Sequence, residues 1–201
     1  MRRVGLVPIA AKPYHAGHHA LVTMAAAEND VVFLFVSTSD RKRKGEMPIL
    51  GADMLRVWRE HLEPILPPNV KVEYGGSPVQ KVYVTLGDAE GLLSDDIFTV
   101  YSDPEDTAAN FPERYREKYF PRLHAAGQVV FAAEENPGRF TRGEGTPDVS
   151  GTKMRAAIET GDVEAFRRGM PPGVDAAAVL DILRPKALGE ALLRAYVRSL
   201  L

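Results

Sequence analysis

The chain has 201 residues, 45% of them hydrophobic, and carries a formal net charge of −2 at pH 7. This length and apolar content suffice for one sizeable α/β domain and exclude global disorder. The small net charge excludes a general attraction to nucleic acid, so any anion site must be local. Because cysteine is absent, disulfides, thiolate nucleophiles and thiolate metal ligands are excluded as well.

Near the start of the chain, two arginines precede a short apolar run that continues directly into Lys-Pro-Tyr-His. A run this short, in front of such residues, favours a buried strand over a signal peptide. No other apolar run approaches the length of a membrane span. We therefore expect a soluble, cytoplasmic protein that binds neither a membrane nor nucleic acid.

Five short apolar runs, bounded by turn residues, recur along the chain at residues 4–9, 31–36, 70–74, 97–101 and 129–132. Such runs are typical of parallel strands that are buried on both faces. Segments with helical spacing lie between them, at residues 17–29, 52–66, 78–92 and 112–126. The alternation predicts an α/β fold with a Rossmann-like, doubly wound sheet of five parallel strands.

The strand pattern disappears after residue 150, and helical segments follow at residues 153–160, 163–168, 174–183 and 188–201. Gly161 is placed to end the first of these helices, and Asp162 is placed to cap the second. We expect an α/β domain over residues 1–160 and a helical extension over 161–201 that packs on it. Residues 134–149, rich in Gly and Pro turn signals, are expected to form a mobile loop.

Two histidines separated by Ala-Gly, His15 and His18, stand where the first predicted strand passes into the first predicted helix. A helix start after a strand offers free N–H groups and a dipole that attract anions at the carboxyl edge of the sheet. Gly17 allows close approach to the backbone, and Lys12 adds a cation. Imidazoles placed here can donate hydrogen bonds to phosphate oxygens and stabilise the charge that develops during phosphoryl transfer.

Two other interpretations of the histidine pair stay open at this point. A metal site would need a further ligand, and no carboxylate or third histidine follows at a useful spacing. A chance pair of loop histidines would leave unexplained both the glycine between them and their place between strand and helix. The anion site is the interpretation that we carry forward.

A second motif, with the sequence Val-Ser-Gly-Thr-Lys-Met-Arg, opens the predicted helix near residue 153. Ser150 is a good helix N-cap, and Thr152 lies in the first turn. Lys153 and Arg155 add two cations, so this helix start can hold the charged tail of a triphosphate. An ordinary capped helix with exposed cations is the alternative interpretation.

The two motifs together resemble the His-x-Gly-His nucleotidyltransferase superfamily, which has the cytidylyltransferase-like fold. Its members include nicotinamide-nucleotide, pantetheine-phosphate and glycerol-phosphate nucleotidyltransferases. The second motif is similar to the family's Ile-Ser-x-Thr-x-x-Arg element, with Val149 in place of Ile. Its form resembles the archaeal and phage-like branch of the nicotinamide-nucleotide adenylyltransferases. The resemblance spans residues 4 to about 160.

The resemblance implies an enzyme that transfers AMP from ATP to a small phosphorylated acceptor such as nicotinamide mononucleotide, with release of pyrophosphate. Mg²⁺ would be bound through the triphosphate, and no protein side chain is expected to ligate a metal. The expected catalytic residues are His15, His18, Lys12 and Arg155. Further nucleotide contacts are expected from Pro8, Ile9, Ala10, Gly17, Ser150, Thr152 and Lys153. A homo-oligomer is also expected.

Three other segments are candidates for substrate contacts. Arg41 and Arg43, in a charge run after the second strand, form either a solvated loop or a lid over the second substrate's phosphate. Ser102 and Asp103 follow the fourth strand, either as a contact to base or ribose or as a plain turn. In the 134–149 segment, Arg139 and Arg142 are placed to close over phosphates.

Other functions compete with adenylyl transfer. Cytidylyl transfer to a small alcohol phosphate differs only in the base, which loop residues would select. A class I aminoacyl-tRNA synthetase fragment shares the histidine motif, but the chain is too short to include a tRNA-binding region. A non-catalytic nucleotide-binding module would bind nucleotides without releasing pyrophosphate.

Overall fold

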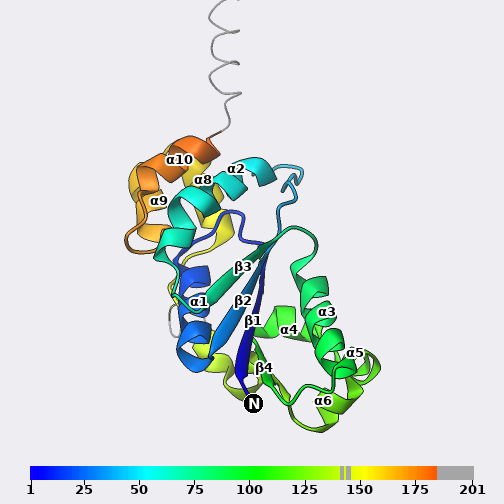
Figure 1. The fold of residues 1–201 in the computed structure, drawn as a ribbon. Coiled ribbons are helices and arrows are strands. Elements are labelled where there is room, and N and C mark those ends of the chain that lie inside the picture. The colour runs from blue at the N-terminus through cyan, green and yellow to red at the C-terminus, as the bar shows by residue number, and fades with distance from the viewer. Residues whose placement is uncertain (141–142, 144–145, 185–201) are drawn as a thin grey trace, which may run out of the picture.

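The computed structural model describes residues 1–140, 143 and 146–184 (Figure 1). Within these residues, five strands form one parallel sheet in the order β3-β2-β1-β4-β5. The strands are β1 (Arg3–Ile9), β2 (Val31–Val36), β3 (Val70–Tyr74), β4 (Ile97–Val100) and β5 (Val129–Phe131). All five predicted runs are strands, so the prediction of a Rossmann-like parallel sheet is confirmed.

Strand β1 lies at the centre of the sheet, between β2 and β4. Its residue Leu6 is in register with Phe33 of β2 and with Val100 of β4. Leu6 and Val7 point to opposite faces of the sheet, and both are fully buried. The strand can be apolar throughout because helices cover both faces.

The helices form a layer on each side of the sheet (Figure 1). One layer contains α1 (Ala16–Glu28) and α2 (Gly51–Val57), whose buried side chains share one hydrophobic cluster with alternate residues of β1 and β2. The other contains α3 (Pro78–Gly91), which packs against the opposite face. The remaining α-helices are α4 (Pro104–Asn110), α5 (Glu113–Tyr119), α6 (Pro121–Ala125), α7 (Ala132–Glu135), α8 (Gly151–Thr160), α9 (Val163–Gly169) and α10 (Ala176–Leu183).

Three segments differ from the predicted elements. The helix predicted over 112–126 is divided into α5 and α6 at Phe120, because Pro121 cannot continue the hydrogen bonding of a helix. The segment after β4 forms helix α4, whose N-cap Asp103 accepts a hydrogen bond from the Asp106 N–H. The 134–149 segment contains the end of α7 and a 3₁₀ turn, Pro137–Phe140, where only a loop was predicted.

The helices after the second motif begin and end at the predicted caps. Gly161 ends α8 in the left-handed conformation with φ 72°, and the Asp162 carboxylate accepts from the Ala165 N–H at the start of α9. Helix α9 packs on α8, and α10 packs on both α9 and α2. The helix predicted over 188–201 lies outside the described residues. Among the helices that are described, none is both long and apolar enough to cross a membrane.

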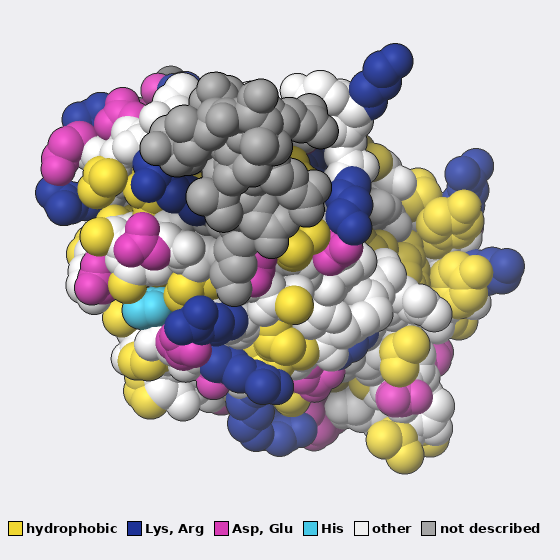
Figure 2. Space-filling model, turned by 90° about the horizontal axis from the view of Figure 1, so that it is seen from above, with side chains coloured by type: hydrophobic (Ala, Val, Ile, Leu, Met, Phe, Trp, Pro, Cys, Tyr) yellow, Lys and Arg dark blue, Asp and Glu magenta, His cyan; other side chains and the backbone are white. Residues whose placement is uncertain are grey.

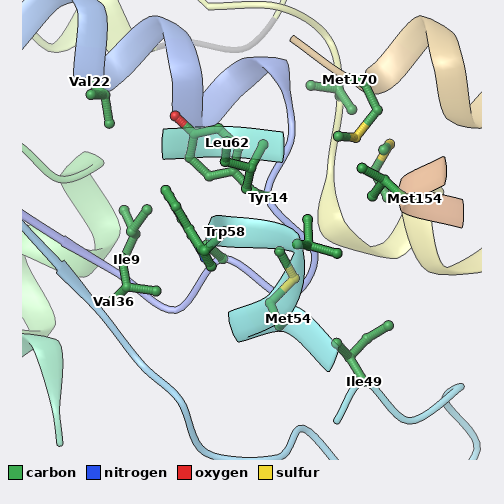
Figure 3. Close-up of a cluster of buried hydrophobic side chains, with 14 of the residues drawn as sticks. Ile9, Tyr14, Val22, Val36, Ile49, Met54, Trp58, Leu62, Met154 and Met170 are labelled. Carbon is green, nitrogen blue, oxygen red and sulfur yellow. The ribbon is translucent and has the colours of Figure 1, made fainter. Parts of the chain in front are cut away.

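A buried aromatic pair links the first motif to the core (Figure 3). Tyr14 precedes the first histidine, and its ring centroid lies 4.7 Å from that of Trp58. Trp58 opens a π-helical turn that continues α2, and both side chains are buried. Met54 extends the same cluster, so the residues that carry the histidines rest on tightly packed apolar side chains.

Replacing Trp58 with alanine is expected to lower the free energy of unfolding by about 3–5 kcal/mol, because the truncation leaves a large cavity in the core. The loss would be measured by urea denaturation followed by circular dichroism. Trp58→Phe is the matched control, and it should lose less than half as much because most of the apolar volume stays. Equal losses in the two variants would contradict this packing role.

Candidate functional site

The candidate site lies at the carboxyl edge of the sheet, where β1 and β4 lead to helices on opposite faces. Ligands of open α/β sheets bind at such a topological switch point. A cavity of about 200 Å³ opens here between the two strand ends. Its lining includes Pro8, Ile9, Ala10, Ala11, His15, Gly17, His18, Leu21, Ser102, Asp103, Asp106, Phe140, Thr146, Pro147 and Val149.

The two histidines of the first motif lie stacked in this cavity. Their ring centroids are 3.8 Å apart, with an interplanar angle of 24°. His15 is the N-cap residue of α1, and a Cβ at Gly17 would lie only 3.1 Å from the His15 ring. The glycine is therefore needed inside the motif to leave room for this imidazole. His18 stacks on Tyr14 at 5.5 Å between centroids, which fixes the plane of its ring.

The next residue, His19, contacts the tyrosine that precedes the histidine pair. Its Nδ1 lies 3.2 Å from the Tyr14 hydroxyl, and burial lowers the pKa of His19 below its ordinary value. Burial also raises the pKa of Tyr14, so this hydroxyl stays protonated and shares a hydrogen bond with the neutral imidazole. His19 thus links α1 to the aromatic pair, although nothing in its sequence position indicates this role.

The lowered pKa of His19 predicts a loss of stability in acid. Neutral His19 is favoured in the folded state, so its contribution is present above the unfolded pKa of 6.5 and is lost as the pH falls below it. The free energy of unfolding should fall between pH 7 and pH 5, with a slope from this group of at most about 1.4 kcal/mol per pH unit. Urea denaturation across this range would measure it. His19→Gln should reduce the slope, and an unchanged slope would contradict the assignment.

Lys12 points away from the histidine pair and toward the end of β2. Its Nζ donates to the hydroxyls of Ser37 and Ser39, at 3.1 and 3.2 Å, and to the Ser39 carbonyl oxygen. The side chain is 8% exposed, and burial lowers the pKa of its ammonium group. The cation is therefore held by the two serines that follow β2.

A second hollow adjoins this lysine. It lies over the ends of β1, β2 and β3, and its lining is mostly hydroxyls and glycine. Gly75 and Gly76 both have positive φ, 86° and 69°, which brings the turn before α3 close to the hollow. Ala10 lines both this hollow and the histidine cavity. The lining residues are Ala10, Ser37, Thr38, Ser39, Gly76, Ser77 and Pro78.

The second motif meets the first in space. Ser150 caps α8 by accepting from the Lys153 N–H at 3.2 Å. One turn on, Arg155 is buried, and its guanidinium donates to the Lys12 carbonyl oxygen at 3.2 Å and to the Thr152 hydroxyl at 3.0 Å. Burial is the main reason that the pKa of Arg155 lies below its ordinary value. The start of α8 and the first motif are therefore in direct contact. Together they form one continuous surface, which we call the wall.

The charged loop after β2 completes this wall. Arg41 and Arg155 both contact the Glu46 carboxylate, with N–O distances of 2.7 and 3.2 Å. The hydrogen bonds from Arg41 are the main reason that the pKa of Glu46 is low. The view from above shows Lys and Arg side chains interspersed with Asp and Glu (Figure 2). The arginines of this wall are thus paired with a carboxylate and do not form an unbalanced positive patch.

Two of the predicted contacts have other partners, and a third lies on an exposed loop. Lys153 forms an exposed ion pair with Asp148 at 3.1 Å. Arg139 pairs with Glu28, which also accepts a hydrogen bond from a buried tyrosine. Arg43 is exposed on the loop, where its charge is felt by Arg155. The remaining candidate of this group, Arg142, lies outside the described residues.

The segment after β4, residues 102–106, was a candidate for a base or ribose contact, and three of its residues line the cavity. Ser102 lines the cavity and its hydroxyl lies 2.7 Å from that of Thr107, while Asp103 lines the cavity and caps α4. Asp106 lines it too, and burial raises the pKa of its carboxyl group, with smaller contributions from Asp103 and Glu105. Asp106 lies in the first turn of α4, a helix that was not predicted.

The fold and the cavity define a Rossmann-like α/β protein with a candidate anion site at the switch point. The family model described as "Citrate lyase ligase C-terminal domain" matches residues 4–49, and this family belongs to the nucleotidyltransferase-like superfamily. The matched segment contains β1, the histidine motif, α1, β2 and the charged loop as far as Ile49. A comparison with curated proteins found no match.

Proposed function

We propose that this protein is a nucleotidyltransferase that transfers a nucleoside monophosphate from a triphosphate to a small anionic acceptor. One observation carries the proposal. The Arg155 guanidinium, far along the chain from the histidines, contacts the backbone of the first motif at Lys12. A triphosphate bound along this wall would be held at both ends, which is what transfer of its α-phosphoryl group requires.

The donor occupies the histidine cavity in this proposal. The α-phosphate lies at His15 and His18, whose stacked rings are fixed by Tyr14. The β- and γ-phosphates lie at the start of α8, where Thr152 and Arg155 offer hydrogen-bond donors and the helix dipole adds positive potential. Preorganised donors of this kind stabilise the charge that develops as the bond to pyrophosphate breaks.

The acceptor occupies the second hollow, where serine and threonine hydroxyls are the anion-binding groups, and Lys12 donates to two of these hydroxyls, those of Ser37 and Ser39. Because Ala10 lines both cavities, the two cavities adjoin at this residue, and the proposal places the acceptor oxygen and the α-phosphorus in contact at their shared edge. The oxygen attacks the α-phosphorus, the bond to the bridging α–β oxygen breaks, and pyrophosphate leaves with the electron pair. An ionised acceptor needs no general base, so positioning and charge neutralisation do the catalytic work.

Magnesium enters the proposal only through the substrate. Among residues 1–140, 143 and 146–184, no group of three or more His, Asp or Glu side chains could hold a metal ion. The stacked histidines are assigned to phosphate oxygens because they lie at the start of α1, where helix N–H groups attract anions. Mg²⁺ bound to the triphosphate would neutralise part of its charge, and no side chain of this protein is assigned to hold it.

Two acceptor classes fit the second hollow. Hydroxyls bind a phosphate, as in nicotinamide mononucleotide or glycerol phosphate, and the Lys12 ammonium behind two of them adds positive charge. They bind a carboxylate as well, and the match to a citrate lyase ligase domain favours a carboxylate as the second candidate. In both classes an ionised oxygen attacks the α-phosphorus, but a carboxylate would give a mixed anhydride, and a phosphate would give a diphosphate.

Pyrophosphate release tests the proposal directly. The assay would cross ATP, CTP, GTP and UTP with phosphorylated acceptors, nicotinamide mononucleotide first, and with small carboxylic acids such as citrate. Release that depends on both substrates supports nucleotidyl transfer and identifies the acceptor class, and we expect ATP to be the best donor. Nucleotide binding without release across the whole grid would instead favour a non-catalytic module.

A further inference from the structure

The Glu46 carboxylate lies at the Arg155 guanidinium, to which the proposed function assigns the β- and γ-phosphates of the triphosphate tail. Its Oε2 lies 2.7 Å from an amino nitrogen of Arg41 and 3.2 Å from one of Arg155. Arg155 is the same guanidinium that reaches the first motif. A carboxylate oxygen and a phosphate oxygen accept from guanidinium groups in the same geometry. The two anions would therefore compete for one set of donors.

The buried state of Arg155 explains why an anion is needed there when no substrate is bound. Its side chain is 8% exposed, and Arg41 and Arg43 add positive charge close by. A buried guanidinium with like charges around it is strongly destabilised unless an anion pairs with it. Glu46 is that anion, and its pKa is held low by Arg41, Arg155 and Arg43. Its carboxylate is thus ionised at neutral pH.

The loop that carries Glu46 is anchored on both sides of it. Arg41 and Ile49 exchange two backbone hydrogen bonds, of 2.8 and 3.0 Å. Ile49 and Met47 are buried in the main hydrophobic cluster, whereas the Glu46 side chain is 32% exposed. The carboxylate can therefore leave the arginines by side-chain rotation while the loop backbone stays anchored.

We propose that Glu46 is an internal anion that exchanges with the polyphosphate tail at Arg41 and Arg155. This inference rests on the proposed function, because it assumes that the tail binds at these arginines. In the empty site Glu46 pairs with the arginines, and it is displaced when the triphosphate binds. After transfer it competes with pyrophosphate for the same donors and so speeds product release. Glu46 is a positioning residue, since it acts through the arginines and touches no reacting atom.

The exchange makes a selective prediction. Every ligand that reaches the arginines must displace Glu46, so its affinity is lowered by the same factor. A nucleoside monophosphate, whose single phosphate lies at the histidines, does not reach them and is unaffected. Removing the charge of Glu46 should therefore strengthen the binding of pyrophosphate and of triphosphates alone.

The test is isothermal titration calorimetry of inorganic pyrophosphate and of AMP with the wild-type protein and Glu46→Gln. We expect pyrophosphate to bind at least tenfold more tightly to the variant, and the affinity for AMP to change less than twofold. Thermal denaturation should show a larger stabilisation by pyrophosphate in the variant. Glu46→Asp, which keeps the charge on a shorter side chain, should give an intermediate gain, and it provides the same test if Glu46→Gln folds poorly.

Glu60→Gln is the matched control, because Glu60 makes an exposed ion pair with Arg56 on the surface turn after α2. Its pyrophosphate affinity should equal that of the wild type. Equal or weaker pyrophosphate binding in the Glu46 variants would overturn the proposal, and so would an equal gain for AMP. Failure of the proposed function is a different result: tighter pyrophosphate binding by Glu46→Gln, with no pyrophosphate released from any substrate pair, would leave the anion exchange standing without catalysis.

Discussion

Replacing His18 with alanine is expected to lower kcat for pyrophosphate release at least a hundredfold while the protein stays folded. Removing one preorganised donor from a transition state that carries developing negative charge commonly costs about 3 kcal/mol in the barrier. The loss should appear mainly in kcat, because the donor is assigned to charge that grows during the reaction. His18 stacks on Tyr14 and His15 and is partly exposed, so its removal leaves only a small gap in packing.

Steady-state assays with the best substrate pair, alongside thermal denaturation, would check this result. His124→Ala is the matched control, since His124 pairs with Glu113 on the surface of α6, away from the candidate site. That variant should retain wild-type turnover. A His18→Ala protein with unchanged kcat would remove the histidines from the catalytic assignment.

Replacing Arg155 with alanine is expected to reduce kcat/KM about a hundredfold or more, chiefly through a higher KM for the triphosphate. Truncating one partner of a buried charge pair costs 2–5 kcal/mol, in the range of about 30- to 4,000-fold. The change also leaves the Lys12 carbonyl without this donor and Glu46 with Arg41 alone, so the free energy of unfolding should fall.

Initial-rate kinetics against triphosphate concentration would separate KM from kcat, and urea denaturation would measure the accompanying loss of stability. Arg155→Lys should recover only part of the affinity, because an ammonium group cannot make the same set of parallel hydrogen bonds. Arg167→Ala, which removes an exposed pair with Glu164 on α9, should leave the kinetics unchanged. A KM for the triphosphate that is unaffected by Arg155→Ala would place the tail elsewhere.

These two predictions concern residues that sequence motifs had already indicated, because local patterns are strong at both places. Apolar runs of strand length predicted every strand, and caps such as Ser150 and Gly161 lie at the predicted helix ends. The missed elements have weaker local signals. Pro121 divides a segment whose amphipathic spacing is continuous, and α4 is a short helix whose stability comes from its cap and its packing.

In the candidate site too, local sequence patterns indicated the residues but not the contacts that these residues make. The sequence indicated Lys12 as a cation for the transferred group, but the structure directs its ammonium toward the serines after β2. The charged loop was predicted either to be solvated or to act as a lid, whereas Glu46 ties it to Arg155. Direction and partner depend on which strands are neighbours, and the spacing of residues in the chain does not contain that information.

By itself, the sequence determined the parallel α/β fold and the two motifs, because hydrophobic periodicity, capping and turn residues act over a few neighbouring positions. Only the tertiary structure decided that Arg155 contacts the loop of the first motif, that a second hollow opens beside Ala10, and that Glu46 pairs with both arginines. These contacts join segments far apart in the chain, and they form because parallel strands bring their carboxyl ends to one edge of the sheet.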